Sequence, residues 1–468
     1  MYYQSTYLLK ALLALFGKSM LPNIFFVRMS KTQNTTELGT SSDAVGWMPE
    51  TSGRGTLTLL TNCLATIMLC TWIVIHPRIC KRKKHRLLHK LALWVKTILA
   101  PEFIAVEAAQ EWTQARKVAK KGSVTTNGEL GIVQALYIGM FGLQYQTSNG
   151  TKIVWPNQFL WLLEQGLLEW KDHKSWGISV EDIKDKSNSD TTGKLFAASQ
   201  VVWFVAQSVM RVVHDLPLSP LETMTLSYVP LFAVTYFYWW TKPRDIQMPS
   251  EIYLPEMTPE QAKVFDSLAL DDQFDNEGTK EQESIWGIWA LTPRLFEKEA
   301  SDRARDRRMQ EQHLEERLTI HNALPSLITK YVFLEPAEPW AEQETVLAHW
   351  DPELYRSRIL WPLCCLAGVS FPALHLISWD SAFPTLIETW LWRTATIASM
   401  VSMLLFMQFE RIVVKWCDPW TIVKILLPST YMVGRLVLLV GTFAALRAMD
   451  PAVYKTYSAS TYWLHITK

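Results

Sequence analysis

Six stretches of this chain are long and apolar enough to be transmembrane helices. Hydrocarbon offers no water to satisfy backbone polar groups, so segments of this length cross it as helices. The parts between them hold most of the charge, as expected where charged side chains avoid hydrocarbon. The sequence therefore predicts an all-α fold, a polytopic transmembrane helical bundle. The predicted spans are Leu57–Ile75, Leu195–Val213, Leu221–Trp240, Ile359–Ser378, Pro384–Phe409 and Pro428–Ala445.

A burst of positive charge follows the first span and indicates its orientation. Seven Lys and Arg residues lie between Arg78 and Lys90, and clusters of this kind stay on the cytoplasmic side of a membrane. The N-terminus is then outside or lumenal. There the sequon at Asn34 is available for N-glycosylation, within a flexible or signal-like segment, residues 1–56. Which membrane holds the protein stays open, as does the cleavage of residues 1–30.

Alternation of the spans across the membrane assigns a side to the rest of the chain. The second and third spans form one hairpin and the fourth and fifth another, each with a short turn on the outer side. In chain order the predicted parts are a cytoplasmic segment 76–194, the hairpin 195–240, a cytoplasmic segment 241–356, the hairpin 357–409, the sixth span with its preceding loop 410–446, and an outer tail 447–468.

Each cytoplasmic segment contains one helix of mixed character. Leu91–Gln110 is nearly long enough to span but holds two acidic residues, a Lys and a Pro. We interpret it as an amphipathic helix at the cytoplasmic membrane interface and leave open whether it spans. Phe296–Leu318 carries acids and bases at helical spacing, which is typical of a solvated helix held by ion pairs one turn apart. A helix that binds a partner protein is the alternative there.

The second span carries a single polar stripe. Gln200, Gln207, Arg211 and His214 are spaced by 7, 4 and 3 residues, which places them within about 60° of one another around a helix. Inside a membrane such a stripe must face protein or water. Two interpretations stay open: a hydrogen-bonded seam between helices, or the lining of a path for a polar solute or a proton.

Five further ionisable residues lie in or beside the later spans. We expect Glu222 to pair with Arg211 across the short turn, and Arg435, which has no partner in its own helix, to pair with a carboxylate on another helix. Together with the stripe, these residues predict one polar intramembrane cluster toward the outer half of the bundle. The five residues are Glu222, His375, Glu388, Arg393 and Arg435.

The sequence shows no motif for catalysis, cofactor binding or metal binding. The six cysteines have no CxxC spacing, and the acids near Asp182 lack the Gly and terminal Glu of a calcium loop. No phosphate-binding loop, dinucleotide glycine motif, G-x-S-x-G or HExxH occurs. The net charge of +1 implies no attraction to nucleic acid. We predict no catalytic residue, cofactor, metal or nucleic-acid partner; the predicted partner is the lipid bilayer.

A series of short sequence blocks extends from about residue 71 to the end of the chain. They include Thr71-Trp72 with His76-Pro77, Leu99-Ala-Pro101-Glu102, Trp203-Phe204, Gln207 with Arg211, Leu221-Glu222, Trp239-Trp240-Thr-Lys242-Pro243, His375, Trp379, Phe383-Pro384-Thr385, Glu388 and Leu391-Trp392-Arg393. This order resembles a large family of fungal multi-pass integral membrane proteins whose function is not established. The chain departs from it at Gln134, Phe141 and Asn188. The resemblance implies a fungal polytopic protein and supplies no activity.

These observations leave three classes of function. We expect a non-enzymatic protein that transports or senses a small solute or ion through the polar cluster. The alternative is a membrane scaffold whose cytoplasmic segments bind a partner protein. An intramembrane enzyme, with His214 or His375 acting beside Glu222 or Glu388, ranks last because no motif selects it. A wet cavity at Arg211 would favour transport, and dry ion pairs would favour the scaffold.

Overall fold

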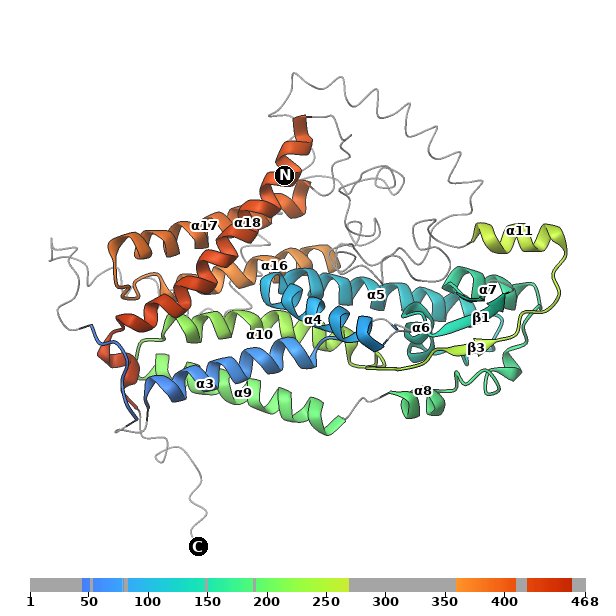
Figure 1. Cartoon of the computed structure of the whole chain (residues 1–468), viewed down its shortest axis with the longest axis horizontal. Helices are drawn as coiled ribbons and strands as arrows, with labels where there is room; N and C mark the ends of the chain where they lie inside the picture. The colour runs from blue at the N-terminus through green and yellow to red at the C-terminus, as the bar shows by residue number, and fades with distance from the viewer. Residues whose placement is uncertain are drawn as a thin grey trace, which may run out of the picture. The chain divides into compact units, whose positions relative to one another are not determined.

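In the computed structural model, Val45–Lys468 forms one compact unit. The structure describes residues 44–50, 54–77, 79, 83–147, 150–187, 191–268, 359–409 and 419–456. Within these ranges the chain is mostly helical. The long helices pack around α10 (Pro220–Trp239), which contacts α3 (Thr56–Met68), α5 (Pro101–Gly122), α16 (Leu360–Leu374) and α18 (Pro419–Ala444) (Figure 1).

Five of the predicted spans coincide with helices long and apolar enough to cross a membrane. Leu69–Ile73 extends α3 as a π-helical turn, and α9 (Thr191–Val213), α16, α17 (Leu386–Phe409) and α18 contain the other four. The apolar stretches are Thr56–Ile73, Gly193–Val213, Trp361–Ser378, Leu386–Met407 and Leu426–Arg447. The structure therefore supports a multi-helix membrane protein.

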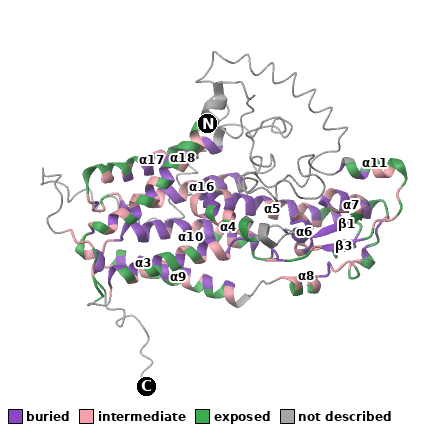
Figure 2. Ribbon diagram, in the orientation of Figure 1, coloured by how far each residue is buried: buried purple, intermediate pink, exposed green. Residues whose placement is uncertain are grey.

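Large apolar side chains remain exposed on the outer faces of these helices. Figure 2 shows the exposed colour along α9 and α17 and the buried colour along α10 and α5. Exposed apolar faces on several neighbouring helices are typical of surfaces that contact lipid or another protein. The exposed side chains include Leu195, Phe196, Val202, Val209 and Val213 on α9, Ile387, Trp390 and Val401 on α17, and Val433, Leu436 and Val440 on α18.

The third predicted span, α10, forms a helix over the predicted residues but is not among the apolar ones. More than half of its residues are buried, and many of these carry hydroxyl groups. Ser219 caps its first turn in a box with Glu222. A helix enclosed by others needs no lipid-facing side chains, which explains its lower hydropathy.

The turns of both predicted hairpins meet at one end of the bundle. Thr223 near the start of α10 and Ser378 near the end of α16 exchange a hydrogen bond of 2.5 Å. Val45 pairs with Met449 beside them, so the described chain begins and ends at this same end. We call it the outer end, following the orientation predicted from charge.

Close contact between α17 and α18 depends on small residues of α18. A Cβ atom added to Gly434 would lie 2.2 Å from the Ser399 Oγ and 3.3 Å from the Ala395 carbonyl oxygen. Gly441 lies against the ring of Trp392 in the same way. These two glycines thus let α18 pack closely against α17.

The fold is not all-α, because a small sheet lies outside the spans. Strands β1 (Leu143–Thr147) and β2 (Gly150–Ile153) form an antiparallel hairpin, and β3 (Ser250–Ile252) pairs with β1 in parallel. The strands are three to five residues long, too short for a clear alternating pattern. Strand β3 follows α9 and α10 in the sequence, so it is distant along the chain from the strand it pairs with. The expectation of an all-α fold was therefore wrong here.

The sheet and short helices form a second core beside the bundle. Its helices are α6 (Ile132–Gly139), α7 (Pro156–Glu164), α8 (Val180–Lys186) and α11 (Pro259–Ser267). Buried side chains from all of them join residues of β1 and β3 in one cluster. The two predicted cytoplasmic segments therefore share one small α/β core. The charged helix Phe296–Leu318 and Asn34 lie outside the described residues.

Replacing Gly434 with Ala should destabilise the protein by about 1–3 kcal/mol, the usual effect of overpacking. The new methyl group would displace Ser399, whose hydroxyl has no hydrogen-bond partner. Ser399→Ala alone should change stability little, and the double variant should recover most of the loss. Thermal unfolding in one detergent measures all three. An equal loss of stability in Gly434→Ala and in the double variant would show that the strain does not come from contact with Ser399.

Candidate functional site

A helix break lies where the sequence predicted one interfacial helix. The chain forms α4 (Lys83–Leu99) and α5, which begins at Pro101. Ala100 between them has φ −144° and ψ 65°, because Pro101 disfavours helical geometry in the residue before it. The interpretation of 91–110 as a single amphipathic helix at the interface was wrong: α5 is largely buried in this region.

The two helices form a hairpin whose tip reaches the middle of the bundle. Lys96 and Glu107 form an ion pair across its arms. At its open end, the Glu111 carboxylate accepts hydrogen bonds from Trp239 and Lys242, where α10 ends. The tip at Ala100 lies instead beside residues halfway along α10 and α18, as the next contacts show.

Side chains from two other helices satisfy the carbonyl groups that the break leaves free. The Ile98 carbonyl accepts hydrogen bonds from the Tyr228 hydroxyl at 2.7 Å and from Arg435 Nη2 at 3.0 Å. Arg435 Nε donates to the Leu99 carbonyl at 2.9 Å. A cation is favourable at the C-terminal end of α4 because the helix dipole is negative there. Arg435 thus finds backbone acceptors rather than the predicted carboxylate partner.

Glu102 occupies the first turn of α5 close to this cation. Its side chain is 0% exposed, and neither carboxylate oxygen has a partner in hydrogen-bond geometry. The charge of Arg435 and the hydroxyl of Tyr431 both act on it. The positive end of α5 favours an anion at this position. We call Glu102, Tyr228, Tyr431 and Arg435 the break cluster.

An aromatic ring closes the break cluster on the side of α16. The guanidinium carbon of Arg435 lies 3.1 Å from the centroid of the Phe371 ring, a cation–π contact. His375, one turn further, packs against Phe371 and Trp392, and its Nδ1 contacts the Phe371 carbonyl at 2.8 Å. The predicted site residues Arg435 and His375 therefore share one neighbour, and the break cluster is surrounded by protein.

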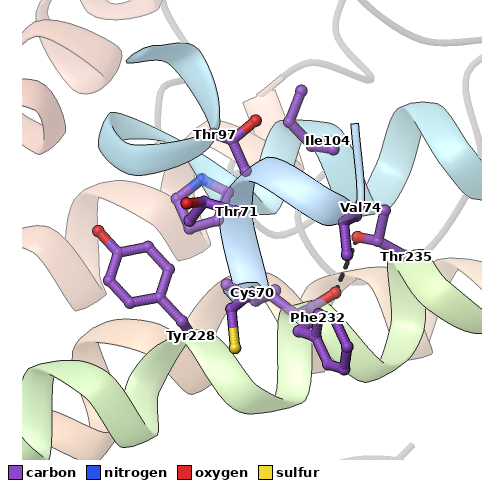
Figure 3. Close-up of a pocket in the computed structure, with 10 residues that line it drawn as sticks. Cys70, Thr71, Val74, Thr97, Ile104, Tyr228, Phe232 and Thr235 are labelled. Atoms are coloured by element: carbon purple, nitrogen blue, oxygen red, sulfur yellow. Dashed lines mark hydrogen bonds between the residues drawn. The ribbon is translucent and has the colours of Figure 1, made fainter. Parts of the chain in front are cut away.

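A small cavity adjoins the break cluster (Figure 3). The volume available to water centres is about 10 Å³, which is enough for about one water molecule. Tyr228 and Pro101 belong to both the cavity and the break. The Thr71, Thr97 and Thr235 hydroxyls lie around it and donate to carbonyls of their own helices. The labelled lining residues are Cys70, Thr71, Val74, Thr97, Ile104, Tyr228, Phe232 and Thr235.

At the outer end, Arg211 anchors the C-terminal segment. Its guanidinium, 1% exposed, donates to the carbonyl groups of Pro217, Ala452, Val453 and Lys455 at 2.8–3.3 Å. These acceptors fill most of its donor capacity. The backbone of the 3₁₀ turn Pro451–Tyr454 is thereby fixed to the end of α9.

The predicted pair of Arg211 with Glu222 is present only as a long contact. Arg211 Nε lies 4.0 Å from Glu222 Oε1, whereas Arg54 Nη2 lies 2.6 Å from the same oxygen. Glu222 Oε2 accepts from the backbone and hydroxyl of Ser219. The principal partner of Glu222 is therefore Arg54, which lies in the segment predicted to be flexible.

The structure divides the other predicted residues among separate places. Glu388 pairs with Arg447, and Arg393 lies 3.4 Å from Asp380 and donates to the Trp379 carbonyl. Gln200 and Gln207 are half-buried on α9, and His214 is half-buried in the turn that follows it. The single cluster expected from the sequence is thus divided between the two turns at the outer end and the break. Sequence reasoning missed Glu102, Tyr228 and Tyr431; the signal was Pro101 within a helical pattern.

With the geometry described, the protein can be placed in its class and family. In the part of the chain that the structure describes, it is a mostly helical protein with five candidate membrane-spanning helices and a buried polar cluster at a helix break. It belongs to a family of unknown function (DUF8562), whose model matches residues 23–268. The match includes the α4–α5 hairpin, α9 and α10. Comparisons with curated proteins and with solved structures give no match.

Arg435→Met should cost about 3–5 kcal/mol, because it removes the donors to two buried carbonyls and leaves Glu102 without a counter-charge. Glu102→Gln in the same chain should restore part of that loss. Arg447→Met is the control: its pair with Glu388 is exposed, so the cost should stay below about 1 kcal/mol. Thermal unfolding compares the variants. If Glu102→Gln restores nothing, Glu102 carries no charge in the folded protein.

A second prediction concerns His76, just after the π-helical turn. Burial lowers its pKa well below 6.5, and the charges of Lys242 and Lys194 lower it further. The folded protein therefore holds His76 neutral, while the unfolded chain protonates it near pH 6.5. Its contribution to stability is present above that pH and is lost as pH falls, by up to about 1.4 kcal/mol per pH unit.

His76→Asn keeps an N–H for the Val74 carbonyl, to which His76 Nδ1 donates at 2.6 Å. Melting temperatures of the wild type and the variant between about pH 7.5 and pH 5.5 measure the effect. The wild type should lose more stability on acidification. Parallel curves would show that His76 does not contribute.

Proposed function

We propose that this protein is an integral membrane protein that senses or moves a proton through the break cluster. The observation that supports this most is Glu102, a fully buried carboxyl at a helix break on which the charge of Arg435 and the hydroxyl of Tyr431 act. Discontinuous helices that place ionisable side chains inside a bundle are a recurrent feature of ion-coupled membrane proteins. The proposed site keeps Arg435 from the sequence prediction and adds Glu102, Tyr228 and Tyr431.

A proton is the ion that this geometry favours. An ionised carboxylate is costly in a dry interior unless a counter-charge accompanies it, so Glu102 has two stable states: protonated, or ionised beside Arg435. The adjoining cavity holds about one water, which is sufficient for proton exchange and too small for a larger solute in this conformation. The Tyr228 and Tyr431 hydroxyls are further proton-exchanging groups beside the carboxyl.

The proposed orientation places the N-terminus outside or in a lumen. The cluster of Lys and Arg residues after the first span then lies in the cytoplasm, with the small α/β core on the same side. On this topology the α4–α5 hairpin enters from the cytoplasm and returns to it, with irregular backbone enclosed by protein as hydrocarbon requires. The resemblance to fungal multi-pass proteins stays a prediction.

A membrane scaffold is the second candidate. Arg211 and Glu222 are buried and are held by carbonyl groups and by an ion pair with Arg54, which is the dry arrangement that favours it. The α/β core would then be the surface for a partner protein. Failure of the proton test below would leave this candidate in first place.

Infrared difference spectroscopy of the reconstituted protein tests the proposal. Between about pH 5 and pH 9 the wild type should show a carboxyl C=O band that titrates and is absent in Glu102→Gln. Glu388→Gln, which removes a half-exposed carboxylate at the outer end, should keep the band. A spectrum without any carboxyl C=O band that depends on Glu102 would contradict the proposal.

If the band is present, proteoliposomes with a trapped pH dye distinguish moving a proton from sensing one. Proton flux that Glu102→Gln lowers at least tenfold indicates transport. A band without flux indicates sensing.

A further inference from the structure

Helix α9 packs on the rest of the bundle with one face and exposes much of its remaining surface (Figure 2). The buried face is a stripe of side chains that follow one another at spacings of four and three residues, which keeps them on one side of a helix. These buried residues are Ala197, Val201, Phe204, Ser208 and Arg211. Arg211 thus belongs to the face of α9 that the bundle covers.

A second stripe with the same spacing lies beside the buried one. It consists of Phe196, Gln200, Trp203, Gln207 and Met210, and we call these five residues the α9 seam. Phe196 is 65% and Trp203 is 42% exposed, and the other three are half-buried. Alternating spacings of four and three residues are the pattern with which a helix packs lengthwise on a partner helix. The α9 seam therefore has the form of a helix-packing surface.

The two glutamines of the α9 seam lie inside the apolar stretch Gly193–Val213. In the part of the chain that the structure describes, neither of their side-chain amides takes part in a hydrogen bond. Hydrocarbon supplies neither donors nor acceptors, so a partly exposed amide is unfavourable there until it finds a partner. The α9 seam thus requires hydrogen-bonding groups that the described residues do not supply.

A second copy of the chain supplies groups of the required kind. A glutamine amide both donates and accepts hydrogen bonds, so it is complementary to an identical amide across a two-fold axis. Two copies inserted in the same orientation have parallel α9 helices, which places each glutamine opposite its counterpart at the same depth. Polar side chains at one position of such a repeat fix the register of the pair, and hydrogen bonds between helices stabilise association in membranes.

We propose that the α9 seam binds the same seam of a second copy and forms a parallel, two-fold dimer within the membrane. Phe196 and Trp203 would supply the large apolar contacts between the glutamine layers. The dimer rests on the proposed membrane location of the protein. It does not rest on proton exchange, because the α9 seam shares no residue with the break cluster.

Energy transfer between copies labelled with a donor or an acceptor measures the association of the full chain in phosphatidylcholine vesicles. Transfer by the wild type should rise with the protein-to-lipid ratio and reach a plateau, as expected for a reversible dimer. Transfer that stays at the level of random encounters at every ratio would overturn the proposal. Protein that does not insert into the vesicles would overturn the dimer and the proposed membrane function together.

Gln200→Met combined with Gln207→Met should weaken the association about tenfold, because it removes the hydrogen bonds and keeps unbranched side chains of similar length. Ser199→Ala is the matched control: Ser199 is exposed on α9, and its hydroxyl already donates to the Phe196 carbonyl, so association should not change. Equal affinity of the glutamine variant and the wild type would contradict the role of the α9 seam.

Oxidative cross-linking in the same vesicles identifies the face that meets the second copy. Met210→Cys, on the α9 seam, should form a disulfide-linked dimer, whereas Val209→Cys, 41% exposed on another face of the same turn, should form little. The chain without an added cysteine gives the background. Equal cross-linking at both positions would overturn the proposal.

Glu102→Gln separates the dimer from the proton function. It should associate like the wild type even though it lacks the infrared band expected from Glu102. A dimer without that band would leave the dimer standing and contradict proton binding, and a band without a dimer would do the reverse.

Discussion

The arrangement of the bundle depends on how one arginine satisfies a broken helix. Pro101 ends α4 inside the bundle and frees carbonyl groups that no solvent reaches. A guanidinium is permanently charged and carries five donors in a fixed plane, so Arg435 can serve Ile98 and Leu99 at once. It also lies against Phe371. One side chain therefore joins α18 to the α4–α5 hairpin and to α16.

The binding of Arg435 by backbone carbonyl groups has an electrostatic consequence. A cation held by carbonyl dipoles is only partly compensated, and Glu102 lies within reach of its charge. Packing alone would be served as well by an apolar side chain at Glu102, because replacing buried charges with apolar groups is often neutral or stabilising. Stability of the fold therefore does not account for a carboxyl at Glu102, and for that reason we assign a function to it.

The sequence predicted the helices better than it predicted their partners. Each of the six spans predicted from apolar length coincides with a helix, including α10, which is enclosed by other helices. The break was missed because apolar periodicity continues on both sides of Pro101. Arg211 and Arg435 were expected to meet carboxylates, yet both bind mainly backbone carbonyls, acceptors that every residue carries and no side-chain pattern reveals. The sheet joins segments more than 100 residues apart, beyond any local signal.

The two ends of the bundle balance their charges in different ways. At the outer end the chain supplies its own acceptors: Glu222 for Arg54 and the carbonyls after Asp450 for Arg211. At the other end of α10, Lys242 pairs with Glu111, and Arg244 and Lys90 share Asp245. Arg211 thus relies mainly on backbone carbonyl groups, whereas these cations rely on carboxylates. Carbonyl groups do not titrate and carboxylates do, so the ion pairs at this end depend on pH more than the contacts of Arg211 do.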